Sequence, residues 1–439
     1  MNKNLNLTIR SLNGLWVGDC IGNIGQLYFA HDILKALDEG VARFGDAINP
    51  HGQHFHLSDD TEEAIVLVNH LNDNGKILQD KYAYELSKRY FERDADGEIY
   101  GYGLMTRTVL RDIYIGKDWR VANQTKPRVE SSSFVDKIIS GVANGKSISA
   151  AMAETNVELQ KELTNKPELK IGSCGNGSAM RVAPLGAFIH ENRINWDDTI
   201  AQLIEEATLQ AQVTHCHSEG IAGSIAVSLL AYYLSAFDKP EVYNFSKPRL
   251  TPQKVYDFVL SYLPSGKVYD GIVKASELPF NMPLIKVIEI IGNGTHVTCQ
   301  DTVPLCVYLT IRGFFSYKLE EYYENTLIDT CKCFGDVDTN CAIVGGLVGI
   351  VNPPPAKWIR YCQPMEGLLG NPLPENKPRS QEIPKFDKLA IKEALKNTEP
   401  TTRITKEIDE PYDMDYSNPE LKKPVEFMEF LKNRKNKIV

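Results

Sequence analysis

Two clusters of acidic and hydroxyl side chains lie far apart in the sequence, and each has the composition of a metal-binding turn. The first is Ser58-Asp59-Asp60-Thr61 and the second is Asp336-Val337-Asp338-Thr339. Carboxylate and hydroxyl oxygens are the ligands that hard cations such as Mg²⁺ prefer, with water completing an octahedral shell. Neither cluster contains His or Cys, which disfavours zinc. If the fold brings the clusters together, they form an all-oxygen site for divalent cations.

Helix capping explains each cluster when it is considered alone. Ser, Asp and Thr accept hydrogen bonds from the N–H groups of a first helical turn, and acids there meet the positive end of the helix dipole. Asp197-Asp198-Thr199 has the same local character, and we interpret it as a cap only. The metal-site hypothesis therefore depends on whether the two clusters meet in space.

Three glycine-rich segments accompany these clusters, at residues 13–22, 101–103 and 172–178. Glycine lets backbone amides approach an anion closely, and a loop that leads into a helix suits a pyrophosphate group. None of the three matches a P-loop or the dinucleotide-binding fingerprint. A tight turn between helices is the alternative explanation, and the pattern at 101–103 is the weakest.

Taken in order, these motifs resemble those of the ADP-ribosylglycohydrolase family, which includes the dinitrogenase reductase-activating glycohydrolase and the vertebrate ADP-ribosyl-acceptor hydrolases. The resemblance spans residues 8–352. It rests on five motifs, namely Gly18-Asp19-x-x-Gly22, Ser58-Asp59-Asp60-Thr61, Gly175-Asn176-Gly177-Ser178-Ala179-Met180-Arg181, Thr214-His215 and Gly335-Asp336-x-Asp338-Thr339-Asn340.

The resemblance implies a compact all-α fold with two Mg²⁺ ions, or Mn²⁺ in some members, at the base of an ADP-ribose cleft. One ion would be held by Ser58, Asp59 and Asp60, the two aspartates being the catalytic residues. The second ion would be held by Asp336, Asp338 and Thr339, and these ligands could be shared between the two ions. The implied substrate-binding residues are Gly172, Ser173, Gly175, Asn176, Gly177 and Ser178 for the diphosphate and distal ribose, together with His215.

The function implied is metal-dependent hydrolysis at the anomeric carbon of the proximal ribose, which releases ADP-ribose from a modified protein or a small-molecule conjugate. One departure supports an alternative. The family often has an acid seven residues after Asp19, where this chain has Gln26. An amide supplies no negative charge and does not readily accept a proton. The alternative is therefore a weak or inactive ADP-ribose-binding or structural protein on the same fold. Lesser departures are Phe334 and Val337, where Gly and Thr are usual.

Four other patterns suggest different chemistry and are less specific. Asp336-Val337-Asp338-Thr339 could begin a phosphatase of the haloacid dehalogenase type, but it lacks a hydrophobic strand before it. The spacing of Cys331 and Cys333 is too short for a usual zinc knuckle. A possible metal cluster of His51, His54 and His56 is interpreted as a solvated loop. The calcium-loop fragment Asp94-Ala95-Asp96-Gly97-Glu98 lacks the remaining ligands of that motif and is interpreted as a turn.

The elements that must position these residues are predicted to be helices. Apolar side chains recur at helical spacing over 64–71 and 200–207, and residues 339–350 are apolar with glycines that allow close helix contacts. The uncharged stretch 220–237 is polar enough to favour a buried helix over a membrane span. Residues 303–309 are the best strand candidate, although Pro304 weakens it. An all-α single domain is the predicted fold class.

Composition limits the function classes and the domain organisation. The 439 residues carry a net charge of −9, which argues against sequence-independent nucleic-acid binding. A polar start, with nine unpatterned cysteines, predicts reduced thiols in a cytoplasmic protein without a signal peptide. More than half of the 23 prolines follow residue 352. We therefore expect a helical body at 8–352 and a proline-rich, charged extension at 353–439 that packs on it. Oligomeric state has no readable signal.

Overall fold

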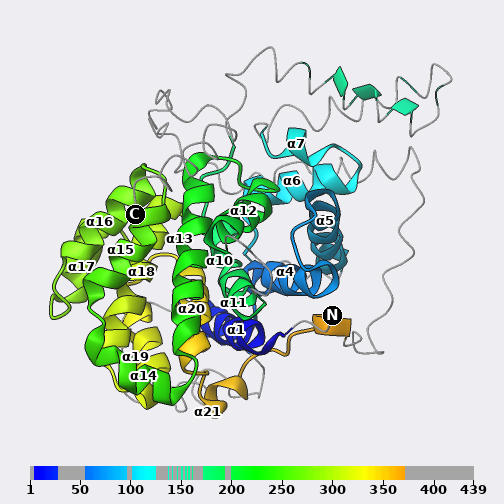
Figure 1. The fold of residues 1–439 in the computed structure, drawn as a ribbon. Coiled ribbons are helices and arrows are strands. Elements are labelled where there is room, and N and C mark those ends of the chain that lie inside the picture. The colour runs from blue at the N-terminus through cyan, green and yellow to red at the C-terminus, as the bar shows by residue number, and fades with distance from the viewer. Residues whose placement is uncertain are drawn as a thin grey trace.

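The protein is built from helices of very different lengths around a helical core (Figure 1). The computed structural model describes residues 4–27, 55–95, 101–124, 172–192 and 199–370, with scattered positions between 137 and 161. These residues contain no β-strand, only isolated bridges at Phe55–Cys362 and Gly175–Thr298, so the all-α prediction is confirmed. The helices are α1 Asn6–Leu27, α4 Asp59–Asn74, α5 Gln79–Ala95, α6 Leu104–Tyr114, α7 Trp119–Ala122, α10 Gly177–Met180, α11 Ala183–Glu191, α12 Thr199–Gln212, α13 Ser218–Leu234, α14 Pro240–Ser246, α15 Pro252–Tyr262, α16 Lys267–Glu277, α17 Leu284–Ile291, α18 Cys299–Ser316, α19 Leu319–Cys331, α20 Val337–Val351 and α21 Ala356–Ile359, with 3₁₀ turns at Ser235–Phe237, Lys247–Arg249 and Leu368–Gly370.

Helices α1 and α20 pack against each other with their backbones in direct contact (Figure 1). Glycines recur every fourth residue on α1, and a Cβ added to Gly18 would overlap the carbonyl oxygen of Cys341. At Gly22 an added Cβ would lie 2.5 Å from the Cα of Asp338. The glycines of residues 13–22 therefore allow two helices to approach. They do not form the anion-binding loop or the turn considered above, because the whole segment is helical.

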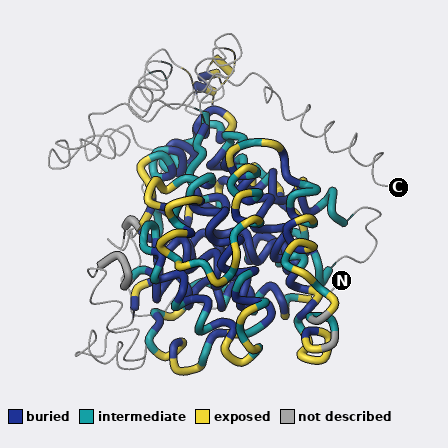
Figure 2. The backbone as a smooth tube through the Cα atoms, turned by 90° about the vertical axis from the view of Figure 1, so that its left-hand side faces the viewer, coloured by how far each residue is buried: buried dark blue, intermediate teal, exposed yellow. Residues whose placement is uncertain are grey.

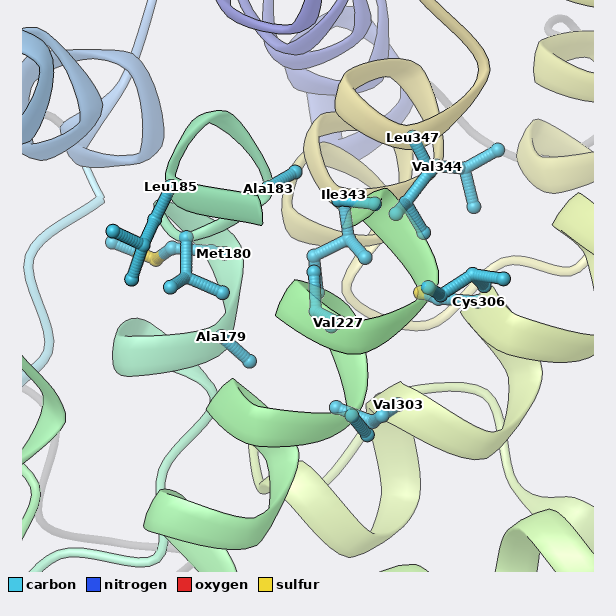
Figure 3. Packing of buried hydrophobic residues seen from close by; sticks show 14 of the residues in the cluster. Ala179, Met180, Ala183, Leu185, Val227, Val303, Cys306, Ile343, Val344 and Leu347 are labelled. Atoms are coloured by element: carbon cyan, nitrogen blue, oxygen red, sulfur yellow. The ribbon is translucent and has the colours of Figure 1, made fainter. Parts of the chain in front are cut away.

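Helix α13 is apolar on all sides because neighbouring helices surround it. Ser218–Phe237 is long and apolar enough to cross a membrane, but 78 % of its most apolar window is buried inside the protein. Side chains of α10, α11, α18 and α20 gather around Val227 of this helix (Figure 3). Buried residues fill the middle of the described part and exposed ones lie on its outer turns (Figure 2). The predicted buried helix at 220–237 is thus present.

The strand prediction at 303–309 is wrong, because these residues belong to helix α18. All seven are buried, so the segment shows neither a period of two nor an amphipathic helical period. Pro304 has no N–H to donate to the Gln300 carbonyl, yet its ring packs where Gly271 of α16 leaves room. Packing on every side outweighs the missing hydrogen bond.

The first part of the C-terminal extension packs on the helical body. Trp16 of α1 donates its indole N–H to the carbonyl of Gln363 at 2.7 Å, and Asn69 of α4 donates to the carbonyl of Gly367 at 2.8 Å. The segment from 353 to 370 thus contacts the two helices that border the first acidic cluster. Residues 371–439 lie outside the described residues.

Candidate functional site

The first acidic cluster forms the N-terminal turn of α4. Ser58 is the N-cap, and its hydroxyl accepts a hydrogen bond from the backbone N–H of Asp60 at 3.2 Å. Asp59 and Asp60 follow in the first turn, where the helix dipole favours negative charge. Their side chains are only 7 % and 1 % exposed. The predicted cap is therefore present, but the acids are buried, which a solvated cap does not require.

Asp19 of α1 joins this turn to the opposite helix. Its Oδ2 accepts from the backbone N–H groups of Ser58 and Thr61, at 2.8 and 3.2 Å, and from the Thr61 hydroxyl at 2.5 Å. Its Oδ1 lies 2.7 Å from the Ser58 hydroxyl. Burial outweighs these bonds and raises the pKa of Asp19 to about 6. From the sequence alone, Asp19 had no role beyond its place in the Gly-Asp motif.

Two buried ion pairs lie behind the same turn of α4. Glu63 is bound by Arg181 at 2.7 Å, and both side chains are almost fully buried. Arg181 also donates to the side chain of Gln210 at 2.8 Å and to Thr214 at 3.0 Å. Glu62 pairs with Arg89 and Arg93 of α5. Glu62 and Glu63 thus each have their own arginine partners, and the turn is held by charged groups on several sides.

The second acidic cluster begins helix α20 and is held differently. Phe334 and Gly335 both have positive φ, +56° and +78°, so the chain turns sharply before Asp336. Asp336 is the N-cap residue without a side-chain cap bond, while Asp338 accepts from the backbone N–H of Thr339 at 2.9 Å. Asn340 donates its side-chain amide to the Asn293 carbonyl at 2.7 Å. Backbone turns and neutral amides therefore set this cluster.

The two clusters meet in the structure. The Thr339 hydroxyl lies 3.5 Å from Asp60 Oδ2, at the long limit of a hydrogen bond, although the residues are 279 positions apart. Burial, together with repulsion from the neighbouring acids, raises the pKa values of Asp59, Asp60 and Asp338 well above the usual range. Burial also raises the pKa of Asp336. Four acids from two remote helix starts therefore lie close enough to affect one another's pKa values.

The chemistry of the donors fits a hard divalent cation. All the groups are oxygens, and Asp60 Oδ1 is buried without a hydrogen-bond partner among the described residues. Such an atom is costly unless something binds it. Within the described ranges, no three His, Cys, Asp or Glu side chains already have the spacing of a metal site. The carboxylates instead engage the caps and hydroxyls described above, so the metal assignment of Ser58, Asp59, Asp60, Asp336, Asp338 and Thr339 stays a prediction.

Gly101 makes room for one of these acids. An added Cβ at Gly101 would overlap Asp59 Oδ1, and the φ of this glycine is +86°. Both observations require glycine at this position. The weak pattern at 101–103 thus has a structural explanation next to the acidic cluster. The sequence offered no way to tell it from an ordinary turn.

The predicted diphosphate loop lies beside the second cluster. Asn176 donates its side-chain amide to Asp336 Oδ2 at 2.6 Å and to the Thr302 hydroxyl at 3.0 Å. The loop also pairs with the segment before α18, since the N–H of Cys299 donates to the Cys174 carbonyl at 2.9 Å. Ser173 and Gly175 are partly exposed, whereas Asn176 and Ser178 are buried. Gly172 to Asn176 thus form a loop that leads into α10 at Gly177 and touches the acidic cluster through Asn176.

His215 lies beneath this loop. It is 2 % exposed, and an added Cβ at Gly177 would lie 2.7 Å from its Cε1. Its Nδ1 is 2.8 Å from the Thr214 hydroxyl. Burial, with a smaller effect from Arg181, lowers the pKa of His215 to about 3, so the ring is neutral at physiological pH. His215 supports the loop from below, and its predicted contact with substrate stays a prediction.

The loop between α17 and α18 also borders the site and was missed from the sequence. The carbonyl of Val297 accepts from the backbone N–H of Asn176 at 3.2 Å. Val297 has a φ of +54°, which is unusual for a β-branched residue. An added Cβ at Gly294 would lie 3.0 Å from the Cβ of Asp336. A short polar loop with two glycines gives no sequence signal that it lies at a site.

The remaining sequence patterns lie elsewhere or outside the described residues. Gln26 belongs to α1, but its side chain is outside the described set, as are Asp32, His51, His54 and residues 96–98. His56 is exposed and lies 3.1 Å from the Gln363 side chain. None of the nine cysteines, all of which lie in the described ranges, forms a disulfide, and the Cys331 and Cys341 sulfurs lie 3.6 Å apart.

Comparisons with known proteins agree with the motif order. The sequence profile of the family described as ADP-ribosylglycohydrolase matches residues 4–375, which is most of the chain. An uncharacterized protein from Archaeoglobus fulgidus is 27 % identical over 195 residues. That alignment covers 44 % of this chain and 54 % of the archaeal protein, so the chain spans about half the length of this relative.

Proposed function

The chain belongs to the ADP-ribosylglycohydrolase family, and we propose that it is a divalent-metal-dependent hydrolase that releases ADP-ribose from a modified protein or a small-molecule conjugate. The bond cleaved would join the acceptor to the anomeric carbon of the proximal ribose. The observation that carries the proposal is the meeting of the two acidic helix starts at Thr339 and Asp60. Around that contact the oxygens are buried and mutually repulsive, which suits a cation.

The proposed cation site uses both clusters. One Mg²⁺ or Mn²⁺ ion would be held by Ser58, Asp59 and Asp60. The other would be held by Asp336, Asp338 and Thr339, or these residues would be shared between the two ions. When bound, such ions supply Lewis-acid polarisation and a water activated at neutral pH.

The chain's own residues would bind and orient the substrate. Ser173 and Gly175 are partly exposed, so a diphosphate could approach this loop, and Asn176 joins the loop to Asp336. Substrate bound along the loop would therefore have its ribose beside the acidic cluster. His215 is neutral, so it could support the loop or donate one hydrogen bond, but it would not act as a cationic group. Holding the sugar in one orientation lowers the entropic part of the barrier.

The test of this proposal is the loss of turnover in Asp59→Asn and Asp338→Asn. Each variant removes one negative charge from one of the two clusters with little change in side-chain size. We expect Mg²⁺-dependent release of ADP-ribose from modified arginine and serine peptides to fall at least about 100-fold in both. Helicity by circular dichroism should stay near wild type. The matched control is Asp73→Asn, an exposed acid near the other end of α4, which should keep full activity.

Gly101→Ala tests the same site without changing a functional group. Its Cβ would occupy the space of Asp59 Oδ1 and would impose strain at positive φ. We expect the release of ADP-ribose to fall in Gly101→Ala, as it does in Asp59→Asn. Gly103→Ala is the control, because nothing lies within 4 Å of an added Cβ there. Normal turnover in both acid variants and in Gly101→Ala would contradict the proposal.

The alternative from the sequence, a protein that binds ADP-ribose without hydrolysing it, is separated by the same assays. Calorimetry with free ADP-ribose measures binding, and the peptide assay measures release. Tight binding without product favours the alternative. A large gain of activity in Gln26→Glu would show that a missing carboxylate limits hydrolysis.

A further inference from the structure

In the described part of the chain, three carboxylates each cap a helix that is remote in sequence. Asp19 caps α4, Glu191 caps α1 and Glu219 caps α16. Glu191 accepts from the backbone N–H groups of Leu7 and Thr8, both at 2.9 Å, and from the Thr8 hydroxyl at 2.5 Å. Glu219 accepts from two backbone N–H groups at 2.8 Å. Helix capping alone therefore accounts for most of what Asp19 does.

Asp19 makes one contact that has no counterpart at Glu191 or Glu219. Its second oxygen, Oδ1, lies 2.7 Å from the Ser58 hydroxyl, and that hydroxyl also lies 2.9 Å from Asp60 Oδ2. The same hydroxyl oxygen accepts from the N–H of Asp60. Asp19 thus links the cap of α4 directly to a side chain of the proposed cation site. It is fully buried, so water cannot replace it.

The single proton of the Ser58 hydroxyl decides how this oxygen can be used. If the proton goes to Asp19, a lone pair of Ser58 Oγ and Asp60 Oδ2 are both left for a cation. If the proton goes to Asp60, it occupies a carboxylate oxygen that the cation needs. A hydroxyl has one donor and two acceptor positions, and one acceptor position is already used by the Asp60 N–H. An acceptor at position 19 therefore favours the arrangement that binds metal.

We propose that Asp19 is a positioning residue that accepts a hydrogen bond from the Ser58 hydroxyl and so leaves a lone pair of that oxygen directed toward the cation. This inference rests on the proposed function only in that it needs a divalent cation at the α4 cluster. It assigns to Asp19 a role beyond capping, and it predicts that the cap and the metal site can be separated by substitution.

Asp19→Asn makes that separation. The asparagine oxygen can keep the bonds to the backbone N–H groups of α4, while its NH₂ group faces Ser58 Oγ and donates to it. The Ser58 proton must then turn toward Asp60 or the cation. Glu191→Gln is the matched control, since it changes the same kind of cap at the far end of α1. Calorimetry with Mn²⁺ alone gives the affinity, and thermal denaturation without metal gives the stability.

We expect Asp19→Asn to bind Mn²⁺ about 10- to 100-fold more weakly than wild type, and Glu191→Gln to bind it normally. Both variants should show similar, modest losses of metal-free melting temperature. Equal Mn²⁺ affinity in Asp19→Asn and wild type would overturn the proposal. If wild type itself binds no Mn²⁺, the metal-dependent function fails first, which is a different result.

A double-mutant cycle with Ser58→Ala tests whether Asp19 acts through this hydroxyl. If it does, Asp19→Asn lowers Mn²⁺ affinity much less in the Ser58→Ala background than in wild type. An undiminished effect would mean that Asp19 acts through its charge, and the proposal would be wrong. Ser58→Ala alone must also weaken Mn²⁺ binding. Wild-type affinity in that single variant would overturn the proposal even if Asp19→Asn did not fold.

Discussion

The starts of α4 and α20 carry the same kinds of side chain but are held by different interactions. At α4, ionisable side chains hold the turn: Asp19 bonds the cap, and Arg181 pairs with Glu63. At α20, a left-handed turn at Phe334 leads into the helix, and Asn176 donates to Asp336. One half of the site is thus set by a buried network of charges, and the other by backbone conformation and neutral amides.

This difference predicts where substitutions act. A buried ion pair that loses one partner leaves an uncompensated charge, which destabilises the whole fold. When a neutral amide is lost, the carboxylate that it oriented has one hydrogen bond fewer, and the effect is mainly on that carboxylate. Changes near α4 should therefore reduce stability first. Changes near α20 should reduce cation binding while the protein stays folded.

The largest expected effect is that of Arg181→Met, on the α4 side. Glu63 would stay buried without its ion pair, so the free energy of unfolding should fall by about 3–5 kcal/mol. Urea denaturation followed by circular dichroism measures this. The double variant Arg181→Met with Glu63→Leu should recover much of the loss, because both charges are then absent. A wild-type midpoint for Arg181→Met would contradict the view that this pair holds the turn.

The next effect is the pH dependence of the metal-free protein. Burial raises the pKa of Asp19 from 3.8 to about 6, and those of Asp59, Asp60 and Asp338 also lie above the unfolded value. At a pH between the unfolded and the folded pKa values, the folded state holds more protons than the unfolded chain. The free energy of unfolding therefore falls as pH rises through this window. The shift at Asp19 alone lowers the free energy of unfolding by about 3 kcal/mol across that window.

A divalent cation should offset this loss, because it stabilises the ionised acids. The gain in melting temperature on adding Mg²⁺ to chelator-treated protein should therefore be larger at pH 8 than at pH 5.5. Differential scanning fluorimetry at both pH values measures it. An equal gain at the two pH values would mean that the acids do not bind the ion.

Asn176→Ala tests the α20 side and should have a smaller effect on stability than Arg181→Met. The loss of the amide that bonds Asp336 should lower the free energy of unfolding by about 1.5–3 kcal/mol. Cation affinity should fall about 10- to 100-fold, because Asp336 is no longer oriented. Chemical denaturation and Mn²⁺ calorimetry give the two numbers. A variant that loses stability but keeps wild-type affinity would show that Asn176 does not orient the acid.

The smallest effect is expected for Phe334→Gly. A non-glycine residue at positive φ carries strain of about 1–2 kcal/mol, which glycine would remove. The greater freedom of glycine in the unfolded chain offsets about half of this gain. We expect a rise in melting temperature of about 1–2 °C. Val297→Gly, at a similar φ outside α20, is the control, and its melting temperature should rise by a comparable amount. A lower melting temperature in Phe334→Gly alone would mean that packing of its half-buried ring stabilises the fold by more than the backbone strain costs.

Much of the fold followed from the sequence because the signals are local. Helical periodicity gave α4 and α12, and the glycines of residues 339–350 gave a helix with close neighbours, now seen as α20. The strand predicted at 303–309 failed where that local signal was absent, since a helix buried on all sides has no polar face to show its period. The same burial hides the pattern in α13, where only length and composition indicated a helix.

For the site, the sequence determined which residues have suitable chemistry, namely the two oxygen-rich helix starts and the glycine loop. It could not distinguish a cap from a binding site, because both use the same side chains at the same position of a helix. Tertiary structure decided that Thr339 reaches Asp60, that Asp19 bonds Ser58, and that Gly101 leaves space for Asp59. These contacts depend on distance in space between residues remote in the chain, and spacing along the chain does not encode that distance.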